Sequence, residues 1–480
     1  MIEFANYIGG AWLAGDEVTI NINPSDTGDI VGEYCNASRE QVRTAIAAAY
    51  AAFGQWSATS PQQRADVLEQ VGIELSARRE ELGELLSREE GKIRAEGVAE
   101  VLRASQIFKF YAQEALRLAG DIIQSIRPGV AVEVIREPVG VVGVITPWNF
   151  PIAIPAWKIA PALAFGNTVV FKPADLTPAL GWHLVEIISR CGAPGGVINL
   201  VMGRGSVVGD EISRSNHVAA VTFTGSVATG RTIREMVTSR GGKIQQEMGG
   251  KSPLIILDDA DLDLAAECAV GGSLLSTGQR CTSNTRIIAT PAIHDALVDR
   301  MVEKAKALTV GHALDAATKI GPVVDERQLE TNMKYVDIAR KEGGRVLYGG
   351  ERLQLACGGY YMSPAVIAGC SNDMQHVREE IFGPVVSILK VDDYEEAVHT
   401  ANDSDFALSS GICTTSLAYA QDFKRRSKAG LVMVNLPTAG VDYHVPFGGR
   451  RGSSYGSREQ GRYAAEFFTE TKTAYVHAPL

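Results

Sequence analysis

Short apolar runs alternate with amphipathic stretches through the middle of the chain. Four runs fall at residues 141–145, 168–171, 197–201 and 218–223, and the stretches between them, 159–165, 179–191 and 206–213, have a helical pattern. Because the runs lack polar alternation, they indicate parallel strands that are buried on both faces and connected by helices.

A second set of apolar runs follows, at residues 254–257, 285–289, 385–389 and 430–434. It predicts a second α/β unit that begins near Gly249. We therefore expect two α/β domains with a cleft between them, which is where ligands usually bind.

The first part of the chain predicts helices. Ser38 with Gln41, and Ser60 with Gln63, have the spacing of capping boxes, and Pro61 occupies the first helical position of the second. Apolar residues recur at helical spacing after both serines. The segment from residue 60 to about residue 110 is expected to form consecutive helices.

Composition indicates an ordinary globular protein of 480 residues, too long for a single core. Its 46 basic and 56 acidic residues give a net charge of −10, and no segment concentrates lysine and arginine. Nucleic acid and anionic membranes are therefore not expected partners.

Seven scattered cysteines form no Cys-x-x-Cys pair, so neither a metal site nor a disulfide framework is expected. The first residues lack the pattern of a signal peptide, and no apolar run approaches the ~20 residues that span a bilayer. These features predict a soluble, cytoplasmic protein.

Two residues suggest covalent catalysis. Cys281 follows the flexible Gly278 segment, and Glu247 ends an apolar run just before Gly249-Gly250. A cysteine nucleophile and a carboxylate base suffice to form a covalent intermediate and hydrolyse it. A single cysteine is more often a small buried hydrophobe, so the pair gains meaning only from its context.

Strand ends are where open parallel sheets bind nucleotides, and several predicted strands end in polar or glycine-rich sequence. Prolines stiffen the loop 146–151, whose Asn149 could donate to an oxyanion. Lys172-Pro173-Ala174-Asp175 could bind ribose hydroxyls, or could be a capped turn. The segment 203–209 departs from the spacing of a dinucleotide loop. Gly225-Ser226 could place backbone amides against a pyrophosphate.

Five motifs together resemble the aldehyde dehydrogenase superfamily, in order and spacing, over essentially the whole chain. They are Thr146-Pro147-Trp148-Asn149-Phe150-Pro151, Phe223-Thr224-Gly225-Ser226, Glu247-Met248-Gly249-Gly250-Lys251, Gly278-Gln279-Arg280-Cys281 and Glu379-Glu380-Ile381-Phe382-Gly383-Pro384.

The resemblance implies an enzyme that oxidises an aldehyde to an acid through a cysteine thioester. Cys281 matches the nucleophile, Glu247 the base, Asn149 the oxyanion-hole amide and Lys158 a lysine that assists proton relay. It also implies NAD or NADP as cofactor. The cofactor-binding positions implied in this sequence are Ile145, Thr146, Pro147, Trp148, Lys172, Asp175, Gly205, Phe223, Gly225, Ser226, Thr229, Gly249, Glu380 and Phe382.

The expected fold is that of an aldehyde dehydrogenase, with two parallel-sheet α/β domains and a small projecting strand pair for oligomerisation. Residues 1–118 and 137–248 are expected to form the dinucleotide-binding domain, and 249–464 the catalytic domain. The segments 119–136 and 465–480 would form the strand pair, which implies a homodimer or homotetramer.

Several stretches, among them Ile154-Pro155-Ala156-Trp157-Lys158 and Ser457-Arg458-Glu459-Gln460-Gly461, resemble the α-ketoglutaric semialdehyde (2,5-dioxopentanoate) dehydrogenases. Such a substrate needs a cation for its distal carboxylate. Arg280 is the first candidate, Arg450 and Arg451 are others, and Trp157 is expected to contact the substrate.

Alternatives remain open at this stage. Succinic semialdehyde dehydrogenases have arginines at the positions of Trp157 and Leu275, which this chain lacks, so succinic semialdehyde is less favoured as the substrate. A broad-specificity aldehyde dehydrogenase is a further alternative. A non-catalytic structural protein is an alternative of another class, but such a protein need not keep Cys281, Glu247 and Asn149 together. Acylating members of the superfamily tend to lack the base, so Glu247 favours a hydrolytic enzyme. Asp175 favours NAD by its charge, but its short side chain leaves room for NADP.

Overall fold

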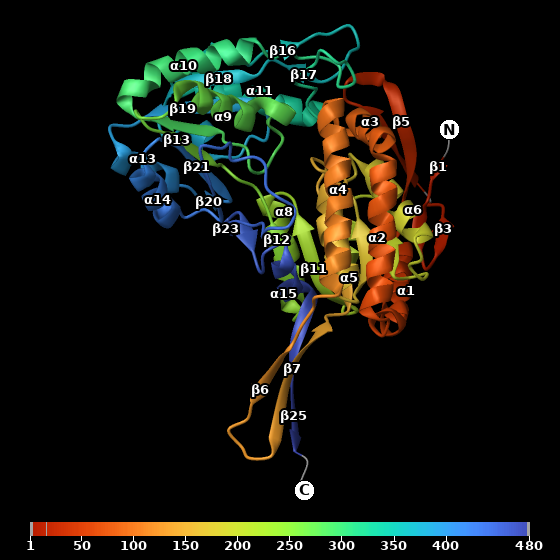
Figure 1. The fold of residues 1–480 in the computed structure, drawn as a ribbon. Helices are drawn as coiled ribbons and strands as arrows, with labels where there is room; N and C mark the ends of the chain where they lie inside the picture. The colour runs from red at the N-terminus through yellow and green to blue at the C-terminus, as the bar shows by residue number, and fades with distance from the viewer. Residues whose placement is uncertain (1–2, 16, 478–480) are drawn as a thin grey trace.

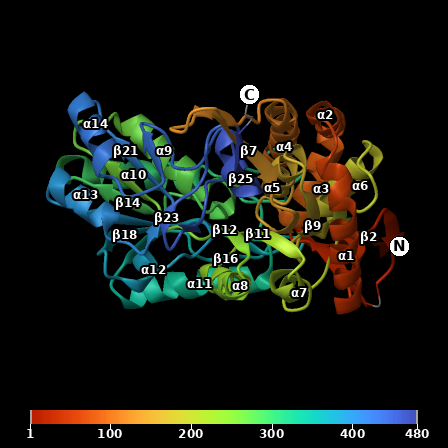
Figure 2. The same ribbon diagram turned by 90° about the horizontal axis from the view of Figure 1, so that it is seen from below.

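The computed structural model describes residues 3–15 and 17–477 as two α/β lobes and a projecting arm (Figure 1). One lobe carries most of the N-terminal half of the chain, and the other most of the C-terminal half. Seen from below, the lobes lie side by side, with β11 and β12 near their junction (Figure 2).

The first lobe contains an eight-stranded sheet in the order β24-β12-β11-β8-β9-β10-β2-β3. The strands from β12 to β10 are parallel, as predicted, whereas β2, β3 and β24 add antiparallel edges. The bounds are β2 Asn6–Ile8, β3 Ala11–Leu13, β8 Val141–Ile145, β9 Thr168–Lys172, β10 Ile198–Leu200, β11 Val218–Thr224, β12 Lys243–Glu247 and β24 Ser454–Tyr455.

Eight helices surround this sheet, and a smaller sheet in the order β1-β5-β4 lies beside it. Both predicted capping boxes are confirmed, at Ser38 and Ser60. The bounds are α1 Arg39–Ser57, α2 Pro61–Ala77, α3 Arg79–Glu90, α4 Arg94–Ala115, α5 Ala153–Ala164, α6 Pro178–Arg190, α7 Val208–Arg214, α8 Val227–Ser239, β1 Glu3–Phe4, β4 Glu17–Asn23 and β5 Asp26–Asn36.

The second lobe contains a seven-stranded sheet in the order β15-β18-β19-β14-β13-β21-β22, parallel except for β15. Its strands are β13 Pro253–Ile256, β14 Arg286–Ala289, β15 Arg345–Tyr348, β18 Ala365–Cys370, β19 Val385–Lys390, β21 Ser409–Cys413 and β22 Leu431–Val434. Its helices are α9 Leu262–Leu274, α10 Pro291–Lys306, α11 Glu326–Lys341, α12 Gln375–Arg378, α13 Tyr394–Asn402 and α14 Leu417–Arg426.

Short elements complete the lobes. They are the 3₁₀ turns Leu275–Gly278 and Arg462–Ala464, the pair β16 Arg352–Leu353 and β17 Tyr361–Met362, the pair β20 Phe406–Ala407 and β23 Arg450–Arg451, and α15 Ala465–Phe468. No helix in the described ranges is both long and apolar enough to cross a bilayer.

Three local expectations needed correction. The helix expected at 159–165 begins at Ala153, and every one of its residues is buried, so it has no amphipathic pattern to mark its start. The strands β18 and β21 were not predicted, although each is almost wholly buried. A short apolar run does not distinguish a buried strand from a buried helix.

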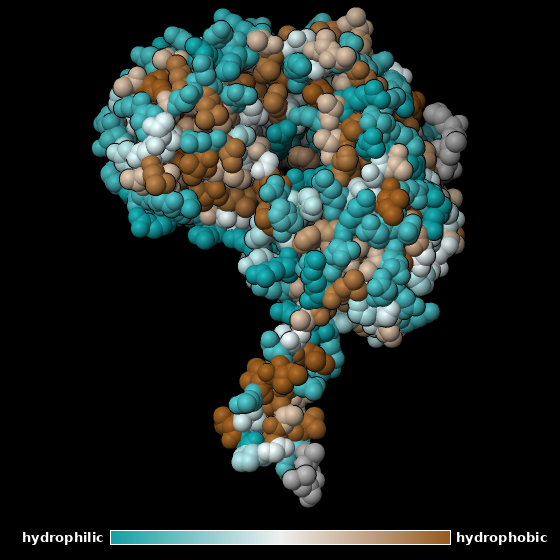
Figure 3. Space-filling view, in the orientation of Figure 1, coloured by the Kyte–Doolittle hydropathy of each residue, from teal (hydrophilic) through white to brown (hydrophobic). Residues whose placement is uncertain are grey.

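The projecting arm is a three-stranded sheet rather than a strand pair. It comprises β6 Asp121–Gln124, β7 Val130–Pro138 and β25 Thr469–His477, in the order β25-β7-β6. The C-terminal strand pairs with β7 and not with β6, because residues 130–138 return along the arm and lie between them. Apolar side chains cover part of its surface (Figure 3).

Candidate active site

A cavity of about 490 Å³ lies between residues of the two lobes. The surface is hollowed in the same region, between the lobes (Figure 3). Helices α4 and α5 line one side of the cavity, and the segments 276–282 and 440–447 line others. Cys281 is part of this lining, so its sulfur lies where a small molecule can reach it.

The backbone before Cys281 is left-handed. Ser276 and Thr277 have φ values of 51° and 55°, which are costly for residues with a Cβ and especially for a β-branched one. A Cβ at Gly278 would collide with the carbonyl of Gly383, so only glycine fits there. This tight turn ends helix α9 and brings Cys281 to the cavity.

The surroundings of Cys281 favour the protonated thiol. Burial raises its pKa to about 12, and the carboxylates of Glu380 and Glu247 add to the effect. The effect of Glu247 on the thiol also means that the two predicted catalytic groups are close in space. The backbone N–H groups of Cys281 and Thr282 lower the pKa and offset part of this effect.

Asn149 is held from two sides. Its side-chain Nδ2 donates to the carbonyl of Gln279 at 2.9 Å, which leaves its second amide hydrogen available. The backbone carbonyl of Asn149 accepts a hydrogen bond from Nζ of Lys92 at 2.7 Å. The Asn149 amide therefore has a fixed orientation against Gln279, which precedes Cys281 by two residues, and an oxyanion donor requires such a fixed orientation.

A buried ion pair supports the Asn149 loop. Lys92 Nζ contacts Glu100 at 2.8 Å, and both side chains are almost fully buried. The other oxygen of Glu100 accepts from the backbone N–H groups of Ile152 and Ala153, at the start of α5. Together these contacts fix the loop at both ends.

Glu247 ends strand β12 and is buried. Ser454, on the adjacent strand β24, donates to its carboxylate at 2.5 Å. Burial raises the pKa of Glu247 well above its usual value, and the nearby carboxylate of Glu459 raises it further. Glu247 therefore holds a proton more readily than an ordinary carboxyl group does.

Lys158 lies behind Glu247. Its ammonium donates to the carboxylate of Glu459 in a short contact and to Oγ1 of Thr222 at 2.8 Å. Lys158 and Glu459 are both fully buried, and charges on both act on the pKa of Glu247. Lys158, Thr222 and Glu459 thus form a buried polar group whose two charges act on Glu247.

A second cavity, of about 590 Å³, collects most of the predicted cofactor-binding residues. Two buried hydroxyls in its lining, Thr146 Oγ1 and Thr224 Oγ1, have no hydrogen-bond partner among the described residues, so a polar ligand fits there. Ser226 caps the N-terminus of α8, where backbone amides favour a phosphate. The predicted residues in this lining are Ile145, Thr146, Pro147, Trp148, Lys172, Asp175, Gly205, Phe223, Gly225, Ser226 and Thr229.

Three predicted cofactor residues, Gly249, Glu380 and Phe382, are not part of this lining. Glu380 accepts from the backbone N–H of Gly250 at 2.8 Å and lies so close to Gly249 that a Cβ there would collide with it. Burial raises the pKa of Glu380 to about 7. The rings of Phe382 and Trp148 meet edge to face at 5.3 Å, which connects the two groups of residues.

The family model for aldehyde dehydrogenases matches residues 12–474. The chain belongs to the aldehyde dehydrogenase family. Membership confirms the fold class and the enzyme class predicted from the sequence, an NAD(P)-dependent aldehyde dehydrogenase.

Three comparisons illustrate the similarity of this aldehyde dehydrogenase to known proteins. It is 41% identical to an alpha-ketoglutaric semialdehyde dehydrogenase of Bacillus subtilis (strain 168) over 98% of each chain. It is 38% identical to a 2,5-dioxopentanoate dehydrogenase of Saccharolobus solfataricus over 97% of each. A betaine aldehyde dehydrogenase of Staphylococcus aureus, solved with NAD+, has a TM-score of 0.96 and 32% identity, covering 98% of this chain and 95% of its own.

The structure separates the predicted substrate residues of this aldehyde dehydrogenase. Trp157 and Arg280 line the cavity that contains Cys281. Arg280 is already paired, because its guanidinium contacts Glu96 at 2.9 Å and Ser276. Arg450 is exposed on β23 and is not part of the lining.

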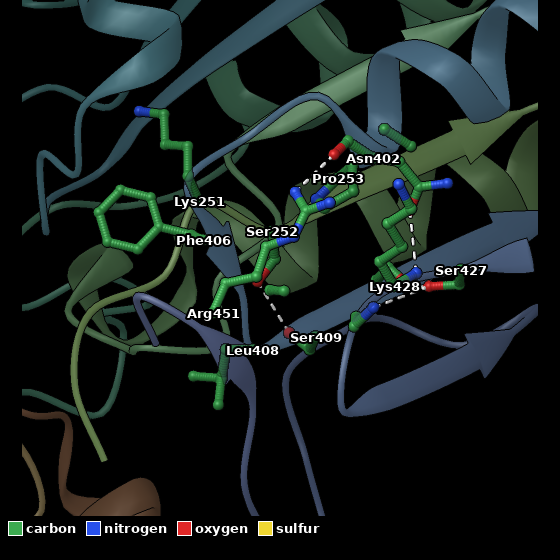
Figure 4. Close-up of a pocket in the computed structure, with 14 residues that line it drawn as sticks. Lys251, Ser252, Pro253, Asn402, Phe406, Leu408, Ser409, Ser427, Lys428 and Arg451 are labelled. Atoms are coloured by element: carbon green, nitrogen blue, oxygen red, sulfur yellow. Dashed lines mark hydrogen bonds between the residues drawn. The ribbon is translucent and has the colours of Figure 1, made fainter. Parts of the chain in front are cut away.

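Arg451 lies in a different, very small pocket of the second lobe (Figure 4). There its guanidinium donates to the backbone carbonyls of Asn402 and Ser404, at 2.9 and 2.6 Å. The structure therefore does not bring the Arg450-Arg451 pair to the cysteine, because β23 pairs with β20 and carries both residues away.

Sequence reasoning missed several residues that the structure brings to this site. Glu459 was noticed only as part of a motif, and Ser454, Lys92 and Glu100 were not noticed. A lysine or glutamate within a helical, charge-rich segment gives no signal of burial. Their distances along the chain from the residues they contact, such as 301 positions between Lys158 and Glu459, hide the pairing.

Proposed function

We propose that this enzyme oxidises α-ketoglutaric semialdehyde to 2-oxoglutarate with NAD or NADP as oxidant. The observation that carries the proposal is a cavity lined by Cys281 and by the cationic side chains of Lys92, Arg103 and Arg280, which suits an aldehyde with a distal carboxylate. Two relatives about 40% identical over nearly the whole chain are named for this substrate, under two synonymous names. Their names support the proposal.

In the proposed first step, the thiol of Cys281 gives its proton to water, and its sulfur forms a bond to the aldehyde carbon as the carbonyl π bond breaks. The carbonyl oxygen becomes an alkoxide, which accepts from the Asn149 amide and from the backbone N–H of Cys281. Because Gln279 and Lys92 already hold Asn149 in place, stabilising the alkoxide requires little reorganisation.

Bound NAD(P)+ supplies the acceptor for the hydride that leaves this carbon, and the cysteine is then a thioester. The two hydroxyls without partners, Thr146 and Thr224, and the capped N-terminus at Ser226 would hold the cofactor, with Glu380 and Phe382 on the other side. Asp175 pairs with Lys172 at 2.7 Å, an arrangement compatible with either cofactor, NAD or NADP.

In the proposed second step, Glu247 takes a proton from water, whose oxygen attacks the thioester carbon and releases the acid and the thiol. The raised pKa of Glu247 suits a base that must work near neutral pH. The Lys158–Glu459 pair behind it offers a route for the proton to leave. This step makes the enzyme hydrolytic and not acylating.

A substrate panel tests the proposal. We expect kcat/KM for α-ketoglutaric semialdehyde to exceed that for pentanal about 10- to 100-fold, since a charge-assisted hydrogen bond contributes roughly 1.5–3 kcal/mol. Steady-state kinetics with both aldehydes and with succinic semialdehyde measure it. Equal values for pentanal and α-ketoglutaric semialdehyde would refute the substrate, and a clear preference for succinic semialdehyde would favour that alternative.

We also propose the domain limits expected from the sequence, with 1–118 and 137–248 binding the dinucleotide, 249–464 forming the catalytic domain, and 119–136 with 465–480 forming the arm. Three elements depart from these limits, because β24 joins the sheet of the first lobe, α15 lies outside the arm, and β7 extends the arm to Pro138. The arm exposes apolar side chains that a partner subunit would cover, among them Ile122 at 88% and Tyr475 at 59%. A homodimer or homotetramer follows from this.

Sedimentation velocity at micromolar concentration is expected to show an oligomer. Ile122→Asp should shift the distribution to smaller species, because a charge would be buried in the interface. Leu417→Asp is the matched control, since Leu417 is 73% exposed on α14, away from the arm, and should leave the distribution unchanged. A wild-type protein that is wholly monomeric would contradict the assembly.

A further inference from the structure

The cavity at Cys281 contains an excess of buried hydrogen-bond donors without partners. In the described part of the chain, four such donors belong to residues of its lining: Arg103 Nε, Trp157 Nε1, Arg280 Nε and Gln460 Nε2, against one acceptor without a partner, Glu96 Oε2. Buried polar groups in native proteins are nearly always satisfied. Four unsatisfied donors in one cavity therefore indicate a ligand that carries several acceptors.

The charges in the lining are mostly paired. Lys92 contacts Glu100 at 2.8 Å, and Arg280 contacts Glu96 at 2.9 Å. Arg103 differs, because no carboxylate among the described residues lies within ion-pair distance of it. Its guanidinium is thus the one cation of this lining, within the described ranges, whose charge is not already matched by a direct contact.

Arg103 is partly buried, which is unfavourable for its charge without an anion beside it. Desolvation lowers its pKa, and the more distant carboxylates of Glu100 and Asp442 offset only part of that effect. Asp442 is exposed, so solvent screens it. Taking one member of an ion pair out of water is unfavourable unless the partner is also there.

Gln460 is held beside Arg103 in a strained conformation. Its backbone has a φ of 59°, and its side chain is fully buried. The terminal nitrogen of Arg103 donates to Oε1 of Gln460 at 3.5 Å, a long contact that leaves Gln460 Nε2 without an acceptor. Strained, buried residues of this kind cluster where a ligand binds.

We propose that Arg103 binds the distal carboxylate of the substrate, and that the Gln460 amide donates to the neighbouring 2-oxo group. This inference rests on the proposed function and names the part of the cavity that would confer its specificity. An α-keto carboxylate presents adjacent acceptors, which match the guanidinium and amide donors that lack partners. Planar guanidinium groups suit a carboxylate better than an ammonium does.

Arg280 is the competing candidate, since it was the first one indicated by the sequence. The carboxylate of Glu96 at 2.9 Å already neutralises it and would repel a second carboxylate. Arg280 also contacts Ser276 in the left-handed turn before the cysteine. Its geometry therefore suits a role in holding that turn, which makes Arg103 the specificity-determining residue.

The decisive experiment measures kcat and KM of the full-length enzyme for α-ketoglutaric semialdehyde and for pentanal. Arg103→Ala should lower kcat/KM for the semialdehyde about 10- to 100-fold, mainly through KM, and change it less than about threefold for pentanal. Arg103→Lys keeps the charge but loses the planar guanidinium group. Its kcat/KM for the semialdehyde should fall between the values of the wild type and of Arg103→Ala. Turnover of pentanal reports that each variant is folded.

Two further variants complete the test. Gln460→Leu should reduce the preference for α-ketoglutaric semialdehyde over glutaric semialdehyde, which lacks the 2-oxo group. Arg94→Ala is the matched control, because Arg94 lies on the same helix but is exposed and makes only surface ion pairs. It should leave both substrates unaffected.

The outcomes separate this inference from the proposed function. A wild-type preference that survives in Arg103→Ala overturns the role of Arg103 and leaves the substrate assignment intact. Loss of the preference in Arg280→Ala but not in Arg103→Ala would give the role to Arg280. A wild-type enzyme with no preference for the carboxylate-bearing aldehyde overturns both.

Discussion

Cys281→Ser is expected to abolish both the burst of reduced cofactor and steady turnover. A serine hydroxyl has a far higher pKa than a thiol and is a poor nucleophile without a dedicated base, and losing a nucleophile can cost on the order of 10⁶ in kcat. Stopped-flow absorbance of the reduced cofactor measures the first phase, and steady-state rates measure the second.

The control for this variant is another cysteine that solvent can partly reach. Cys191 ends helix α6 and is not part of the lining of either cavity. Cys191→Ser should keep both phases at wild-type rates. Substantial oxidation by the Cys281→Ser variant would rule out the thioester route.

Glu247→Gln should keep the burst and slow steady turnover about 10²- to 10⁴-fold, the usual contribution of a general base. The amide has a similar shape, so Ser454 and the strand pairing with β24 remain, and acylation does not need the carboxylate. Rapid-quench or stopped-flow measurements separate the two phases. Disappearance of the burst together with turnover would show that Glu247 acts before the thioester forms.

The role of Glu247 as a base also predicts how the rate of deacylation depends on pH. Burial and Glu459 raise the pKa of Glu247, so the fraction of the active carboxylate increases as pH rises through that raised value. Wild-type deacylation should therefore accelerate with pH above the usual carboxyl range, and this rising limb should vanish in Glu247→Gln. Glu235→Gln, an exposed substitution on α8, should retain the wild-type profile.

Local patterns in the sequence accounted for much of the fold. The capping boxes at Ser38 and Ser60 and the unbroken apolar runs of β8, β9 and β11 express short-range preferences, which act on neighbouring residues whatever the rest of the chain does. The buried start of α5 and the strand β21 were missed, because uniform burial removes the periodicity on which such predictions depend.

The residues of the site also divide into those that local motifs in the sequence predicted and those that only the structure showed. Short motifs that must keep an unusual backbone, such as the Gly278 turn before Cys281, are visible in the sequence. The resemblance assigned cofactor contacts to Lys172 and Ser226 only by position, and the structure brings both residues into one cavity. A motif is local, so its members stay together when the chain folds.

The sequence by itself determined the family, the order of the functional motifs along the chain, and the candidates Cys281, Glu247 and Asn149. Only the tertiary structure decided which arginine is paired. Arg280 contacts Glu96, which lies 184 positions away, whereas Arg103 contacts no carboxylate of residues 3–15 and 17–477 directly. Nothing in either local sequence distinguishes the two arginines. Pairing and burial of charge depend on contacts between distant segments, so they arise only when both lobes and their connecting loops have folded together.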